Sequence, residues 1–264
     1  MKNYRGLSLS LLCLALITVC LLLPGRPFAQ DQIQKPKIFQ ETYDLINDTD
    51  LYCSFYMLEQ GKKLPDIQII GAERMDEHVE FSDDQTVYIN RGKVDGLEIG
   101  DLFQVIGIEE KVPPYGTVVL KRGRVRVVRL EDKVAVGRIE KSCNPVRVGD
   151  YLLPFEEQEG EIGKDKGYDV MDPNASKRGQ VIYVENGIHV SAAGQWALID
   201  LGRQHCVQIG DQLTVFHRVR PNLPREPIGS AIIIDVRGAT ATVKVLSSRD
   251  AVEVGNEVQL NVAR

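Results

Sequence analysis

Apolar and polar residues alternate in short runs along much of the chain, and a recurring three-residue turn precedes four of these runs. Each copy has Ile or Val, then Gly, then Asp or Asn. Alternation with a period of two is typical of strands that bury one face. The four copies are Ile99-Gly100-Asp101, Val148-Gly149-Asp150, Ile209-Gly210-Asp211 and Val254-Gly255-Asn256. The residues predicted to face a core after them are Phe103, Val105, Leu152, Leu213, Val215, Val258 and Leu260.

Backbone geometry explains the composition of this turn. Glycine adopts positive φ without steric cost, and an Asp or Asn side chain hydrogen-bonds the backbone two residues further on. A catalytic pair of carboxylates would instead need a fixed separation in the folded chain. We therefore interpret all eight residues as structural and predict no catalytic role for them. They are Gly100, Asp101, Gly149, Asp150, Gly210, Asp211, Gly255 and Asn256.

The four turns fall into two longer units of the same layout. Val87–Gly92 precedes one turn, and Ala197–Gly202 precedes another at the same spacing. Further along, Gly116–Val119 corresponds to Gly229–Ile232. Short runs of strand type, without helical periodicity and separated by Gly and charged turns, favour small barrels or sandwiches. The sequence predicts an all-β fold with two tandem small β-barrel or sandwich domains.

Two segments of different composition lie outside these units. Residues 30–63 form an N-terminal segment, predicted to be short helical or irregular, in which the polar run Asn47–Asp50 should end a helix. Residues 156–178 are rich in Glu, Gly, Asp and Lys, which is typical of a solvated, flexible linker. The predicted β domains are then residues 64–155 and 179–262.

The first 29 residues have the organisation of an export signal. Lys2 and Arg5 give a positive start, Leu7–Leu23 is free of charge, and Pro24-Gly25 follows. The apolar stretch is shorter than the roughly 20 residues of a bilayer-spanning helix. Residues 1–29 are therefore predicted to be a signal peptide, with a retained anchor as the alternative and no transmembrane span after cleavage. The predicted location is the periplasm or outer envelope of a bacterium.

Composition and motifs argue against several classes of function. The 264 residues have a formal net charge of −5, with 43% hydrophobic and 26% charged residues, which are proportions of a globular protein. An acidic chain repels phosphate backbones, so no nucleic-acid partner is expected. The four histidines form no metal-binding motif, and no phosphate-binding or nucleophile motif is present. We predict no metal, no cofactor and no enzymatic activity.

Removal of a signal peptide would leave three cysteines, Cys53, Cys143 and Cys206. In an oxidising compartment they allow one disulfide within a monomer. Cys53 and Cys143 both precede the predicted linker and Cys206 follows it, so we predict that the first two pair and tie the N-terminal segment to the first β domain. The alternative is that all three are small buried apolar residues. Cys206 and its neighbour His205 are expected in a loop, without a catalytic role.

Two groups of basic residues have two interpretations. Alternation over Arg124–Val127 places arginines on one face of a strand and valines on the other. The arginines form either a solvated outer face or a docking surface for an acidic partner. The groups are Lys121, Arg122, Arg124, Arg126 and Arg129, and then Arg218, Arg220 and Arg225.

Several segments carry a resemblance to known proteins: Asp50–Phe55, Val87–Asp101, Ser142-Cys143, Val148–Phe155 and Gly229–Leu260. They resemble bacterial exported proteins that are often fused to LysM modules, and the repeat resembles the C-terminal domain of the flagellar assembly protein T family. With the predicted export, this leads to the hypothesis of a non-enzymatic adaptor or scaffold in a periplasmic or cell-wall-associated assembly. Its partners would be envelope proteins or peptidoglycan. The alternatives are a module that binds peptidoglycan or another glycan, and an envelope hydrolase.

Overall fold

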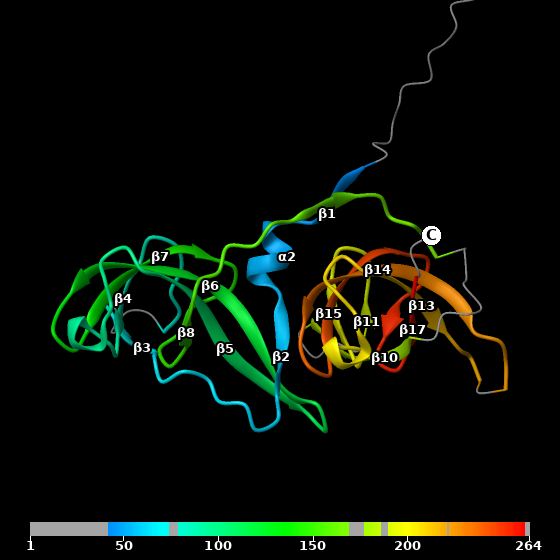
Figure 1. Ribbon diagram of the computed structural model, residues 1–264, viewed down its shortest axis with the longest axis horizontal. Coiled ribbons are helices and arrows are strands. Elements are labelled where there is room, and N and C mark those ends of the chain that lie inside the picture. The colour runs from blue at the N-terminus through cyan, green and yellow to red at the C-terminus, as the bar shows by residue number, and fades with distance from the viewer. Residues whose placement is uncertain (1–41, 74–78, 169–176, 186–189, 221, 262–264) are drawn as a thin grey trace, which may run out of the picture. The chain divides into compact units, whose positions relative to one another are not determined.

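The computed structural model of the protein describes residues 42–73, 79–168, 177–185, 190–220 and 222–261 (Figure 1). The predicted signal peptide, the start of the N-terminal segment and residues 169–176 of the predicted linker lie outside these ranges. The fold is mostly β, with 52% strand and 6% helix. The predicted all-β class is therefore confirmed.

Strands β2 to β8 form a seven-stranded antiparallel sheet. Neighbouring strands follow the order β3-β4-β7-β6-β5-β8, and β2 pairs with the first part of β6. Backbone hydrogen bonds of Ile69, Gly149 and Leu152 bring the two edges, β3 and β8, together. The elements are β2 (Phe55–Glu59), β3 (Ile69–Ala72), β4 (Thr86–Ile89), the 3-10 helix η1 (Lys93–Asp95), β5 (Leu102–Val112), β6 (Gly116–Leu130), β7 (Ala135–Ser142) and β8 (Tyr151–Pro154).

The second half of the chain forms a closed six-stranded barrel. Its strands follow the order β10-β12-β15-β14-β13-β17, and the short strands β11 and β16 pair separately. The elements are β10 (Arg178–Val184), β11 (Val190–Ser191), β12 (Trp196–Ile199), the 3-10 helix η3 (Arg203–His205), β13 (Gln212–His217), β14 (Glu226–Val236), β15 (Ala241–Ser248), β16 (Val252–Glu253) and β17 (Glu257–Leu260).

The two sheets have the same strand order when the strands are counted within each of them. Leaving out β2, β11 and β16, both run first, second, fifth, fourth, third, sixth. Each also has a 3-10 helix between its second and third strands, η1 in one and η3 in the other. The same strand order thus occurs in both sheets.

Each sheet encloses its own hydrophobic core. The first core contains Phe103, Val105 and Leu152, and the second contains Leu213, Val215, Val258 and Leu260. All seven residues predicted to face a core are buried. In β6, Val125 and Val127 are buried while Arg124 and Arg126 are only half-buried, as the alternation predicts. Burial of such aliphatic side chains is worth about 1.5–3 kcal/mol each.

The N-terminal segment folds differently from the sequence prediction. Strand β1 (Tyr43–Ile46) is followed by helix α2 (Asp48–Cys53) and then by β2. The polar run Asn47–Asp50 begins a helix and does not end one. The reason is a capping box, in which Asn47 Oδ1 accepts from the Asp50 amide and Asp50 Oδ2 accepts from the Asn47 amide.

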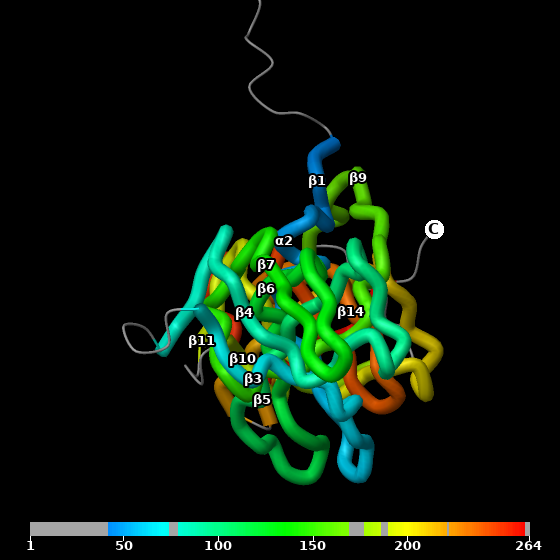
Figure 2. The backbone as a smooth tube through the Cα atoms, turned by 90° about the vertical axis from the view of Figure 1, so that its left-hand side faces the viewer, coloured from blue at the N-terminus to red at the C-terminus, as the bar shows by residue number. Residues whose placement is uncertain are grey.

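The predicted linker makes more contacts than its composition suggests. Strand β9 (Glu161–Gly163) pairs with β1, and the two lie side by side in Figure 2. Two residues later, Asp165 Oδ2 accepts hydrogen bonds from the hydroxyls of Ser230 and Ser247, both at 2.8 Å. A carboxylate between two serine hydroxyls attaches this part of the segment to the barrel.

Candidate functional site at the N-terminal segment

The four turn glycines have the backbone conformation that the sequence pattern requires. The φ angle is 102° at Gly100, 94° at Gly149, 88° at Gly210 and 94° at Gly255. Residues with a Cβ rarely adopt this region, because the side chain approaches the backbone too closely. The four turns lead into β5, β8, β13 and β17.

The Asp or Asn side chain of each turn bonds backward along the chain. Asp101, Asp150, Asp211 and Asn256 each accept a hydrogen bond from the backbone amide three residues earlier, at 2.7 to 2.9 Å. The predicted bond to the residue two positions further on is therefore wrong. The glycine with positive φ folds the chain back, so the earlier amide lies nearest to the side chain.

Asp150 differs from the other two turn carboxylates, Asp101 and Asp211, because it is also buried among charges. It is 6% exposed, and its Oδ1 lies 3.3 Å from Arg122 Nε. Burial raises the pKa of this carboxyl to about 6, although the Arg147 amide and the Arg122 charge lower it. Arg122 also donates to Pro145 O and to a carboxylate oxygen of Glu109.

His205 and Cys206 lie in the loop where the sequence places them. His205 Nδ1 accepts from the Gly202 amide at 3.0 Å, just as Asp95 accepts from the Gly92 amide at 2.9 Å in the first unit. Cys206 follows with a φ of 54° and an exposed free thiol. The imidazole therefore closes a turn and is not directed at the thiol.

Most of the basic residues singled out in the sequence are ion-paired. Arg124 and Arg126 both contact Glu140. Because carboxylates neutralise the positive charges of these arginines locally, the first group of basic residues does not present a free basic face. The remaining pairs of these groups are Arg122 with Glu109 and Asp150, Arg129 with Glu131, Lys121 with Asp235, Arg218 with Glu257, and Arg225 with Glu257.

Helix α2 carries the best-partnered carboxylate of the N-terminal segment. Asp50 is 3% exposed; its Oδ1 accepts from Trp196 Nε1 at 2.9 Å and its Oδ2 from Lys244 Nζ at 2.7 Å. Both donors belong to the barrel. The next residue, Leu51, is packed with Ile232 and Ile234 of β14. A short helix of the N-terminal segment is thus fixed to the second β unit by charge and by apolar packing.

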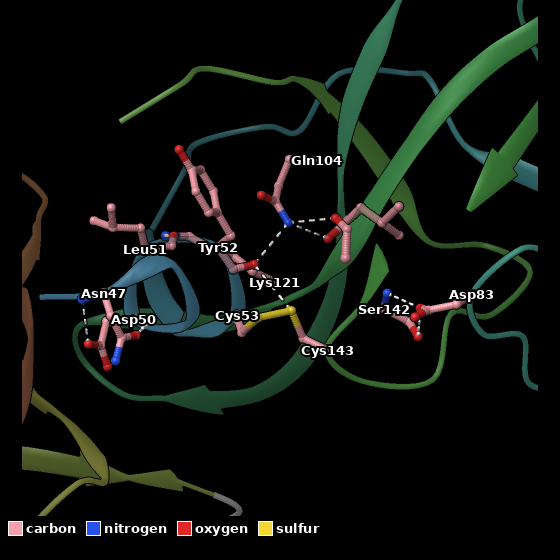
Figure 3. The surroundings of a disulfide bond; sticks show 12 residues. Asn47, Asp50, Leu51, Tyr52, Cys53, Asp83, Gln104, Lys121, Ser142 and Cys143 are labelled. Atoms are coloured by element: carbon pink, nitrogen blue, oxygen red, sulfur yellow. Dashed lines mark hydrogen bonds between the residues drawn. A yellow bond between two sulfur atoms is a disulfide. The ribbon is translucent and has the colours of Figure 1, made fainter. Parts of the chain in front are cut away.

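The same helix is covalently attached to the first β unit. A disulfide joins Cys53, the last residue of α2, to Cys143, which follows β7, with a Cα–Cα distance of 5.4 Å. The predicted pairing is confirmed. Figure 3 shows Tyr52 O beside this bond, where it accepts from Gln104 Nε2 at 3.3 Å. Closing a loop of 90 residues stabilises a fold by about 4 kcal/mol on the chain-entropy model.

Lys121, in strand β6 of the first β unit, contacts both helix α2 and the barrel. Its ammonium donates to Leu51 O of α2 at 2.6 Å and lies 3.7 Å from Asp235 Oδ2 of the barrel. Burial lowers the pKa of Lys121, against the opposing effect of Asp235. Asp235 in turn forms two hydrogen bonds with Arg237, whose guanidinium lies 3.8 Å from the ring centroid of Tyr56. Burial raises the pKa of the Tyr56 hydroxyl to about 12.

Strand β2 continues the contacts made by α2. Phe55 O accepts from Thr242 Oγ1 at 2.7 Å, and Glu59 Oε1 accepts from the Ala239 amide at 2.9 Å. The Phe55 ring also makes edge contacts with the rings of Tyr183 and Trp196. We call Asp50, Phe55 and Glu59, with their barrel partners, the clamp.

A cavity of about 520 Å³ lies beside the clamp. Such a volume falls in the range of small-ligand sites, which often lie between domains. One part of the lining is apolar, and it includes Phe55 and Tyr183. Another part is charged, and burial raises the pKa of its Glu185 carboxyl. The lining residues are Phe55, Ile108, Glu109, Glu110, Val118, Leu120, Arg122, Asn144, Pro145, Arg147, Tyr183 and Glu185.

Comparison with known proteins assigns no family to the chain. No protein-family model matches it, and no curated protein matches it. Within the described residues, no group of His, Cys, Asp and Glu side chains is arranged to hold a metal ion. None of the helices in this part of the chain is long and apolar enough to cross a membrane.

The sequence interpretation missed the clamp. Asp50 was assigned to a helix-breaking run, and Glu59, Trp196 and Lys244 were not singled out. One local signal was available, because Asn47 and Asp50 have the spacing of a capping box. The barrel partners carry no local signal, since Lys244 lies 194 residues from Asp50 in sequence.

Proposed function

We propose that this chain is a non-enzymatic adaptor or scaffold of the bacterial cell envelope, acting through two β domains of one repeated fold. The observation that carries the proposal is the clamp. An N-terminal segment that is disulfide-bonded to one β domain and hydrogen-bonded to the other suits a protein that presents two surfaces together. The signal-like residues 1–29 and the disulfide support export to a periplasmic or cell-wall-associated assembly.

The turns offer the first positions at which to look for a partner. The aliphatic residue before each turn glycine is exposed: Ile99 by 68%, Val148 by 42%, Ile209 by 52% and Val254 by 44%. Single exposed aliphatic residues are ordinary. Four exposed at the same position of a turn are the better candidates for contact with envelope proteins.

Site-specific photo-cross-linking in cells tests the adaptor proposal. A photoreactive residue would replace Ile99 or Ile209, with the exposed Lys133 as the matched control position. The proposal expects a discrete protein adduct from at least one turn position and none from position 133. It fails if neither turn position gives a protein adduct.

The second candidate function is direct binding of peptidoglycan, and the cavity of about 520 Å³ favours it. Its mixed apolar and charged lining suits a glycan or a short peptide stem. Purified sacculi would be sedimented with the wild-type chain and with a Glu110→Gln, Glu185→Gln variant. Co-sedimentation that the variant loses supports this function, whereas wild-type protein that stays in the supernatant excludes it.

A further inference from the structure

We propose that the Cys53–Cys143 bond is an exchangeable disulfide, which a dithiol reduces in the folded protein, and that its opening loosens the clamp. The inference concerns control of the clamp, so it does not depend on which partner the adaptor holds. It starts from the surroundings of the two sulfur atoms in Figure 3.

The two cysteines differ in accessibility. Cys53 is 6% exposed, whereas Cys143 is half-buried and lies in the segment after β7. A small cavity of about 50 Å³ borders both residues, and Tyr52, Gln104 and Gly123 form part of its lining. Cys143 is thus the more exposed of the two cysteines, and we take its Sγ as the atom that an incoming thiolate attacks.

The charges around this cavity favour both the attack of one thiolate and the departure of another. Arg124 and Lys141 line it, with Asp48 as the one carboxylate. Arg124 is paired with Glu140, whereas Lys141 is exposed and forms no salt bridge within the described part of the chain, although its charge helps to lower the pKa of the Asp83 carboxyl. A neighbouring cation attracts an anionic attacker and stabilises the thiolate that leaves, and a thiol of lower pKa leaves faster.

A dithiol is the reductant and supplies the two electrons that the disulfide takes up. Its thiolate attacks Cys143 Sγ, a mixed disulfide forms, and Cys53 Sγ leaves with the electron pair of the former bond. The second thiol of the reductant then closes on its own sulfur and releases Cys143 as a thiolate. The dithiol becomes a disulfide, and its two protons end on Cys53 and Cys143.

Opening the bond acts on the clamp because Cys53 ends the helix that carries Asp50. Without the bond, α2 keeps hydrogen bonds from Lys121 to Leu51 O and from Gln104 to Tyr52 O and stays joined to β2 through the main chain, but it loses its cross-link to the segment after β7. Trp196 is the only tryptophan, and its indole donates to Asp50. Its fluorescence therefore reports directly on the clamp.

The test uses the oxidised full chain in mild non-ionic detergent, with dithiothreitol as the dithiol. Thiol alkylation followed by mass spectrometry gives the rate of reduction, and Trp196 emission is recorded in parallel. We expect reduction faster than global unfolding, accompanied by a red shift of the emission. Reduction only at the rate of global unfolding, or an unchanged emission spectrum after complete reduction, would overturn the proposal.

The Lys141→Gln variant tests whether the lysine charge promotes the exchange or whether the bond is merely accessible to the reductant. Removing the Lys141 charge raises the pKa of the leaving thiol, and a thiol of higher pKa leaves more slowly. The matched control is Lys133→Gln, an exposed lysine at the opposite end of β7. We expect slower reduction in the first variant and an unchanged rate in the second. Equal rates in both variants would contradict the role of the cationic cavity.

Discussion

Single glycines and carboxylates determine the turns of this protein, and their geometry sets the effect of substitution. Gly100 and Gly210 both have positive φ. They differ in their surroundings, because a Cβ at Gly100 would meet open space, while one at Gly210 would meet the Glu161 carboxylate. Backbone strain is thus the only cost at the first position, and it is joined by a steric cost at the second.

Gly100→Val is predicted to lower the free energy of unfolding by more than about 1 kcal/mol, because a β-branched residue is strained at positive φ. Gly210→Val should cost more, since the Glu161 side chain must also move. Urea unfolding gives both values, with Ile99→Val in the same exposed turn as the control. Midpoints equal to that of the wild type would show that the turns tolerate a side chain.

Asp150 predicts a pH dependence of stability. Its folded pKa of about 6 lies above the ordinary value of 3.8, so the folded state binds the proton more tightly. This contribution is fully present below pH 3.8 and is lost as the pH rises through 6. A shift of this size corresponds to about 3 kcal/mol.

Asp150→Asn should remove that dependence, because an amide stays neutral and still accepts from the Arg147 amide. Urea unfolding at pH 4 and pH 7 is the measurement. The wild type should lose stability relative to the variant between these values. A wild type that gains stability over this interval, relative to Asp150→Asn, would mean that the Arg122 charge outweighs burial.

At the scale of elements, the strands could be predicted from the sequence and the N-terminal helix could not. Alternation places Val125 and Val127 in one core, and the turn glycines mark where β5 and β13 begin. In α2, by contrast, a polar residue of the first turn, Asp50, is buried because its partners lie in the barrel. Asp50 is buried only after Trp196 and Lys244 reach it from β12 and β15. Alternation within one segment carries no information on such partners.

The Asp50→Asn variant tests how much the contact between α2 and the barrel contributes to stability. The variant leaves the Lys244 ammonium with 14% exposure and without its carboxylate. Breaking one half of a buried ion pair costs about 3–5 kcal/mol. Asp48→Asn, on the exposed side of the same helix, is the control and should change stability by less than about 0.5 kcal/mol. If chemical unfolding shows similar losses of unfolding free energy for both variants, Asp50 has no special role in stability.

At the scale of the whole molecule, two β units with separate cores are coupled by α2 and by β2, which pairs with β6 of the first unit. Each core is a closed set of apolar residues from its own strands. The contacts between the units pass through α2, β2, the Lys121–Asp235 pair and an apolar cluster in which Val118 of β6 joins Tyr183 and Leu198 of the barrel. Each unit therefore has the means to fold independently, and the clamp decides whether the two unfold together.

The oxidised protein is predicted to unfold in one cooperative transition, with coincident curves from Trp196 fluorescence and far-UV circular dichroism. A variant with Asp50→Asn and Glu59→Gln should show two transitions, because it loses contacts from both α2 and β2. Asp48→Asn with Glu98→Gln removes the same number of charges, but from exposed side chains, and should keep the curves coincident. Separate transitions in the wild type, or coincident curves in the clamp variant, would show that coupling arises elsewhere than in these contacts.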